Sequence, residues 1–144
     1  MFACRKVYTD FPAAHRQPNH KGHCALIHGH NWSFEFEFKA GALDSNQFVL
    51  DFGELSWLKQ WLTHMFDHTL LLCANDPLIL TLQQAQYSGM DFAEIRTMES
   101  TSCEGIARYV HSVVAPLVYA KYPGRVWLSR VTVYEDSKNS AYYE

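Results

Sequence analysis

Two histidines separated by one glycine, His28-Gly29-His30, are the residues in this sequence best suited to hold a metal ion. In an extended backbone, side chains two positions apart point to the same face, so both imidazoles can reach one ion. A third histidine from a neighbouring strand would leave a tetrahedral zinc with one open position, as a catalytic site requires. The tripeptide alone fits equally well a polar turn with two solvated histidines, because short motifs arise often by chance.

A thiol accompanies the candidate ligands, because Cys24 stands four residues before His28. A thiolate with a lowered pKa can act as a base near neutral pH, whereas an isolated cysteine is more often a small buried hydrophobic residue. A closed structural zinc site is not expected, since it would need four protein ligands and usually paired cysteines. Five of the eight histidines crowd into one short segment; they are His15, His20, His23, His28 and His30.

The composition predicts a single folded domain over residues 1–144. Hydrophobic residues make up 48% of the chain and charged residues 19%, which argues against disorder. A formal net charge of −3 gives no indication of nucleic acid or an anionic membrane as a partner. No apolar run is long enough to span a bilayer, and no signal peptide is recognisable. The four widely spaced cysteines are therefore expected to be reduced thiols in a cytoplasmic protein.

Four strands are predicted. In residues 31–39, four aromatic residues at even positions alternate with polar ones, which is the period of a half-buried strand. A β-prone set in residues 1–11 predicts a first strand that ends at Pro12. We expect these two strands to pair as a hairpin whose long connection holds Cys24. Residues 125–135 and 141–143 predict the third and fourth strands.

Two main helices are predicted between the strands. The first begins at Asp51 and ends at Asp67-His68, and the second follows residues 100–104, with Pro116 expected to kink it or shorten its last turn. A short inserted surface helix is expected from Leu78 to about Tyr87. The order predicts an α+β domain, in which a four-stranded antiparallel sheet carries the two main helices on one face.

Five short motifs, met in order along the chain, resemble those of the 6-pyruvoyltetrahydropterin synthase family. They are Phe11-Pro-Ala-Ala-His15, Cys24-x3-His28-Gly-His30, Asp51-Phe52, Asp67-His68 and Glu135. The resemblance covers essentially the whole chain, and the spacing from Cys24 to His28 is similar to that of the branch that makes 6-carboxytetrahydropterin for queuosine. One segment departs from the family's Pro-Thr-x-Glu-Asn, because here it reads Thr101-Ser102-Cys103-Glu104-Gly105.

The resemblance implies the tunnelling fold, in which trimers close their sheets into a barrel and two trimers stack into a homohexamer. Active sites then lie between subunits, so Glu135 and the metal site could come from different chains. The exposed strand edges of a four-stranded sheet give an independent reason to expect association.

The resemblance also implies a set of site residues. Zn²⁺ would be held by His15, His28 and His30. Cys24 would act as a base, and the Asp67-His68 dyad would relay protons. Without the family match, we would interpret that dyad as a helix C-terminal cap.

The implied substrate is 7,8-dihydroneopterin triphosphate. Glu135 would anchor the pterin ring through two parallel hydrogen bonds, with Glu104 assisting. The implied products are 6-carboxy-5,6,7,8-tetrahydropterin, acetaldehyde and triphosphate. Candidate contacts for the triphosphate form a local basic cluster of Arg16, His20, Lys21 and His23.

Two alternatives stay open. One is 6-pyruvoyltetrahydropterin synthase activity, which loses triphosphate but keeps all three side-chain carbons. The other is a non-catalytic module that binds a pterin or zinc.

Overall fold

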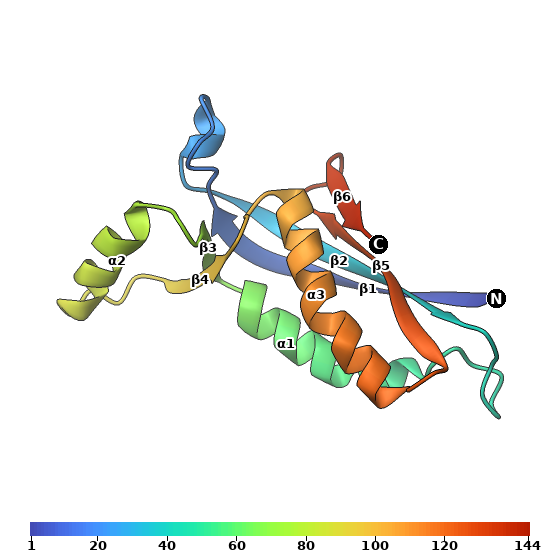
Figure 1. Cartoon of the computed structure of the whole chain (residues 1–144). Helices are drawn as coiled ribbons and strands as arrows, with labels where there is room; N and C mark the ends of the chain where they lie inside the picture. Colours follow the sequence, from blue (N-terminus) through green and yellow to red (C-terminus); the bar gives the residue numbers. More distant parts are fainter.

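A long antiparallel hairpin forms the centre of the computed structural model, which describes all residues 1–144 (Figure 1). Strand β1 (Phe2–His15) pairs along its length with β2 (His28–Ala40). Strands β5 (Val126–Tyr134) and β6 (Ser140–Tyr143) continue the sheet antiparallel on the far side of β2. These are the four strands that the sequence predicts.

The sheet has six strands in the order β4-β3-β1-β2-β5-β6, so the predicted count of four is wrong. Strands β3 (Thr69–Cys73) and β4 (Glu94–Met98) add a parallel extension beside the end of β1. All five residues of β3 are buried. A strand covered on both faces is a continuous apolar run without alternation, and such a run does not identify itself as a strand.

Strand β1 does not end at Pro12, as the sequence analysis expected, but continues to His15. A shift of register between Tyr8 and Phe11 marks a bulge, and Asp10 there has a φ of 71°. Because β3 pairs with β1 only from Ala13 onward, Pro12 lies on an edge where its missing N–H breaks no ladder. The extra residues bring His15 into the sheet.

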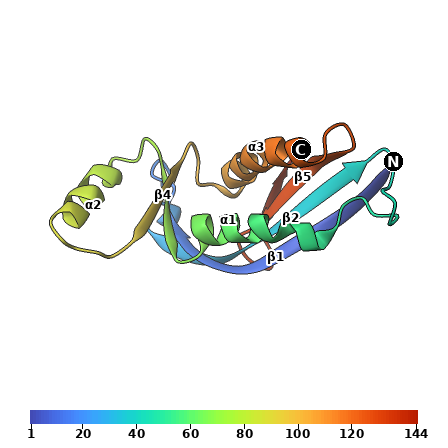
Figure 2. The ribbon, with the colours of Figure 1, turned by 90° about the horizontal axis from the view of Figure 1, so that it is seen from below.

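Two helical segments cover one face of the sheet (Figure 2). Asp51 caps a short 3-10 turn (Phe52–Leu55) by accepting a hydrogen bond from the Gly53 N–H, and α1 (Ser56–Phe66) follows. Helix α3 (Cys103–Lys121) continues through Pro116, so that proline does not end the helix. The predicted arrangement of both main helices on one face is confirmed.

The core lies between that face and the helices. Trp32, Phe34, Phe36 and Phe38 of β2 are completely buried, as their alternation predicts. A slip of one residue would move all four rings to the other face, so their burial fixes the register of β2. His28 and His30 have the same parity as these rings and therefore lie on the helix-covered face.

The predicted inserted helix is present as α2 (Leu78–Tyr87), between β3 and β4, and it projects from the body of the molecule (Figure 1). None of its ten residues is buried. All four cysteines are free thiols. No helix of the chain combines the length and the apolar character needed to cross a membrane.

Candidate metal centre

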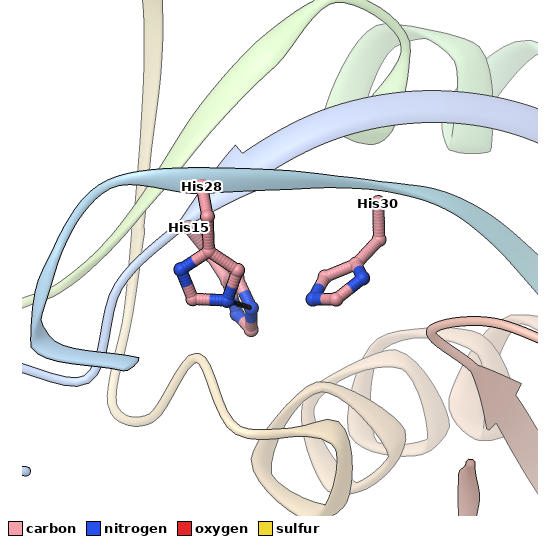
Figure 3. Close-up of side chains that lie close together, drawn as sticks. All are labelled: His15, His28 and His30. Carbon is pink, nitrogen blue, oxygen red and sulfur yellow. Dashed lines mark hydrogen bonds between the residues drawn. The ribbon is translucent and has the colours of Figure 1, made fainter. Parts of the chain in front are cut away.

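Three histidines meet where the β1–β2 hairpin opens (Figure 3). His15 at the end of β1 lies opposite His28 at the start of β2, and His30 follows on the same face of β2. One ring nitrogen from each of the three lies within 4.8 Å of the others, and the Nε2 atoms of His15 and His28 are 3.0 Å apart. His15 is 3% exposed, whereas the other two are half-buried. The predicted ligand trio is therefore brought together by the fold.

Backbone carbonyls fix the tautomer of two of these rings. His15 Nδ1 lies 2.7 Å from the Thr101 carbonyl oxygen, and His28 Nδ1 lies 2.8 Å from that of Leu26. A carbonyl only accepts hydrogen bonds, so each Nδ1 must carry the proton. In the neutral rings, the two Nε2 atoms then face each other with lone pairs.

Two lone pairs held 3.0 Å apart repel each other unless a cation lies between them. Zinc binds imidazole nitrogen at about 2.0–2.1 Å, so two nitrogens on one tetrahedral ion lie roughly 3.3 Å apart. Hydrogen bonds from the outer ring nitrogen to a carbonyl are also the usual support of metal-bound histidine. The three-nitrogen donor set, and the tautomers and spacing of His15 and His28, thus fit a metal ion that binds imidazole, such as zinc.

Burial lowers the pKa of His15 from its ordinary value of 6.5 to about 4. The hydrogen bond to Thr101 opposes this effect, and the neighbouring His28 and His30 add to it. Metals bind the neutral form of imidazole. His15 therefore needs no deprotonation at neutral pH before it can act as a ligand.

The three histidines open into a cavity of about 420 Å³ that also contains the predicted base and the predicted pterin-binding residues. Cys24 reaches it from a 3-10 turn in the β1–β2 connection (His23–Ala25), Glu104 from the first turn of α3, and Glu135 from the end of β5. Glu135 Oε2 lies 3.9 Å from His30 Nε2 in the same chain. One chain therefore brings Glu135 and the trio together, and no second chain is needed for this contact.

The turn that carries Glu135 is held by Asp136. Its carboxylate accepts hydrogen bonds from the backbone N–H groups of Lys138 and Asn139, each at 2.7 Å, and these bonds lower the pKa of Asp136. The Glu135 N–H closes the turn by donating to the Asn139 carbonyl. This local network positions Glu135 at the cavity wall.

A second thiol, Cys103, also lines the cavity. It donates a hydrogen bond to the Val133 carbonyl, and burial raises its pKa to about 11. Cys103 is therefore protonated at neutral pH and is unsuited to act as a base. Of the two thiols at this cavity, Cys24 remains the candidate.

The Asp67-His68 pair lies outside this cavity. His68 Nδ1 is 2.7 Å from Asp67 Oδ1, and a φ of 55° at His68 provides the bent backbone that lets these adjacent residues meet. The His68 side chain is 82% exposed. It lines a separate, open hollow together with Ala14, Gly29 and His30, so of the trio only His30 borders both hollows.

Other residues near the trio differ from the sequence-based expectation. Arg16 forms a 2.7 Å ion pair through its Nε with the completely buried carboxylate of Asp76, so this edge of the guanidinium is already engaged within the protein. Only His23 of the basic cluster lines the cavity. The contact between His15 and Thr101 was not predicted, because the two residues are 86 positions apart and the pattern around Thr101 indicates only a helix start.

Known proteins resemble this chain in sequence and in fold. A family model described as 6-pyruvoyl tetrahydropterin synthase matches residues 5–144. The chain is 32% identical over 111 residues to a 6-carboxy-5,6,7,8-tetrahydropterin synthase of Rickettsia typhi, covering 76% of this chain and 78% of that one. It is 42% identical over 65 residues to a putative enzyme of the same name from Archaeoglobus fulgidus, covering 45% of this chain and 55% of the other.

Two solved structures have a similar fold. An uncharacterized protein from Wolinella succinogenes superposes with a TM-score of 0.81 at 19% identity, covering 99% of this chain and 98% of that one. A catalytic-residue mutant of the 6-pyruvoyltetrahydropterin synthase of Plasmodium vivax superposes with a TM-score of 0.67 at 17% identity, with the same coverage.

Proposed function

Because the chain belongs to the 6-pyruvoyl tetrahydropterin synthase family, we propose that it is a zinc-dependent lyase that makes 6-carboxy-5,6,7,8-tetrahydropterin. Its substrates would be 7,8-dihydroneopterin triphosphate and one water molecule, which supplies the second carboxylate oxygen, and acetaldehyde and triphosphate would leave. One observation carries this proposal: the three-histidine centre, Cys24 and Glu135 share one cavity. The names of the Rickettsia and Archaeoglobus relatives support the carboxylated product.

His15, His28 and His30 would hold the zinc ion. When bound, zinc supplies Lewis-acid chemistry, which lowers the pKa of a hydroxyl group on the substrate side chain. Three protein ligands would leave one position for that hydroxyl. The protein's own side chains would bind the substrate and transfer its protons.

Glu135 would orient the substrate. A carboxylate can accept two parallel hydrogen bonds from the ring N–H and the exocyclic amine of a pterin, which fixes the orientation of the ring as well as binding it. Glu104 faces the same cavity and would assist. Because Glu135 lies beside His30, a ring held there places its side chain next to the metal centre.

Cys24 would remove a proton from the substrate side chain. The Asp67-His68 dyad would relay protons, with Asp67 orienting the His68 ring through their hydrogen bond. Since neither Asp67 nor His68 lines the cavity that contains the trio, we propose that the dyad serves the cavity of a neighbouring subunit in a homohexamer. The unpaired edge of β1 before Ala13, and that of β6, provide strands for such an assembly.

The test is to identify the product by mass spectrometry after zinc-loaded protein is incubated with 7,8-dihydroneopterin triphosphate. We expect the mass of the carboxytetrahydropterin together with one trapped acetaldehyde per turnover, and neither with zinc-free protein. A product that keeps all three side-chain carbons would show that the protein has 6-pyruvoyltetrahydropterin synthase activity instead. Zinc binding without turnover would favour a binding module.

A further inference from the structure

We propose that Thr101 is a positioning residue that aims His15 at the metal and ties the metal centre to the start of α3. This inference rests on the metal centre of the proposed function. It concerns a residue in the segment where the chain departs from the family pattern, and it assigns that residue a role at the metal.

Thr101 is completely buried and makes two hydrogen bonds to the end of β1 and the residue after it. Its carbonyl oxygen accepts the 2.7 Å hydrogen bond from His15 Nδ1, and its hydroxyl donates to the Arg16 carbonyl at 2.8 Å. The same hydroxyl lies 3.3 Å from both Gln17 Nε2 and Cys73 Sγ. One residue therefore holds the ring of His15 and the backbone that follows it.

The orientation of the His15 ring depends on this contact because it is the hydrogen bond that the structure gives to His15 Nδ1. Without an acceptor at Nδ1, an imidazole can move its proton to Nε2, and a protonated nitrogen cannot bind a metal. His15 is 3% exposed, so water has little access to its Nδ1. The corresponding partner of His28 is the carbonyl of Leu26, which is 67% exposed, so water can substitute there.

The turn that contains Thr101 is also fixed on the side of α3. Ser102 caps this helix by accepting a hydrogen bond from the Gly105 N–H at 3.0 Å. Gly105 packs so closely that an added Cβ would lie 2.5 Å from the Cβ of Ser100. Because Glu104 lies in this first helical turn and faces the cavity, the turn sets where Glu104 lies relative to His15.

The test compares Thr101→Val with the conservative Thr101→Ser. Valine keeps the shape of threonine and the backbone carbonyl but loses the hydroxyl that anchors the turn to Arg16. We expect zinc affinity, measured by competition with a chelator, to fall roughly tenfold or more, as for loss of other supports of metal-bound histidine. Thr101→Ser restores the hydroxyl and should bind zinc as tightly as the wild type.

Thr69→Val is the matched control, because Thr69 is also buried and its hydroxyl also donates to a backbone carbonyl, that of Met65, at 3.0 Å. It should lower the stability of the protein without changing zinc affinity. The visible absorption of the cobalt-substituted protein provides a second readout, which should change in Thr101→Val and not in Thr69→Val. Wild-type zinc affinity and an unchanged cobalt spectrum in folded Thr101→Val would overturn the proposal.

If Thr101→Val does not fold, the wild-type protein itself gives the answer. Nitrogen-15 chemical shifts of the zinc-loaded protein should show His15 protonated at Nδ1, with that proton protected from exchange. A freely exchanging Nδ1 proton, or metal bound through Nδ1, would overturn the proposal. None of these measurements requires turnover, so a protein that passes them all and makes no product refutes only the proposed function.

Discussion

Acidification should destabilise the metal-free protein through His15. The pKa of this buried ring falls from 6.5 to about 4 on folding, so between these pH values the unfolded chain binds a proton that the folded chain does not. Stability therefore falls as the pH drops from about 6.5 to about 4, and it is unaffected by His15 above that window. Since a tenfold change in proton affinity is worth about 1.4 kcal/mol, the total loss is about 3 kcal/mol.

The assay is urea denaturation of the metal-free protein, in chelator, at several pH values from 7.5 to 4.5. Many carboxylates also titrate in the lower part of this range, so the comparison is with His15→Gln, whose amide N–H can still donate to the Thr101 carbonyl. As the pH falls, the free energy of unfolding of the wild type should decrease more steeply than that of the variant. The difference between the two slopes should correspond to at most one extra proton bound by the unfolded wild-type chain. Parallel curves for the two proteins would show that protonation of His15 does not destabilise the fold.

Three further substitutions have predicted outcomes. Gly105→Ala places a Cβ 2.5 Å from that of Ser100 and should lower the free energy of unfolding by about 1–3 kcal/mol in a denaturation experiment. Asp76→Asn leaves Arg16 without its buried carboxylate partner and should cost about 3–5 kcal/mol by the same assay. Cys24→Ala should lower kcat by roughly 100-fold or more while zinc content, measured by elemental analysis, stays at the wild-type level.

Each of these substitutions has a matched control. Gly41→Ala introduces a Cβ with nothing within 4 Å and should leave stability unchanged. Arg5→Gln breaks an ion pair whose arginine is 63% exposed and should cost less than about 1 kcal/mol. Cys4→Ala removes a thiol that does not line the site cavity and should leave turnover intact. Equal effects in a substitution and its control would contradict the explanation given for that substitution.

The parts of the fold that the sequence predicts are those with local periodicity. The aromatic alternation from Trp32 to Phe38 identifies β2, and its parity places His28 and His30 on the covered face. The helices follow from apolar spacing and from end signals such as Asp51. These features are readable because neighbouring residues determine them.

The features that the sequence does not predict depend on contacts between distant segments. All five residues of strand β3, which pairs with β1 and β4 inside the sheet, are buried, so the strand lacks the alternation that would reveal it. Thr101 supports His15 across 86 positions, and no short motif records that contact. The exposed placement of His68 depends on how the end of α1 lies against β1. There the backbone N–H of His68 donates a hydrogen bond to the Pro12 carbonyl.

X-ray absorption spectroscopy of the zinc-loaded protein tests most directly whether the three-histidine centre is an open catalytic site. An open three-histidine site should show three nitrogen ligands at about 2.0–2.1 Å and one exchangeable oxygen, with no sulfur. Adding substrate should change the oxygen ligand and leave the nitrogens in place. A sulfur at about 2.3 Å would rule out an open site, because Cys24 would then close the site as a fourth ligand and could not serve as the base.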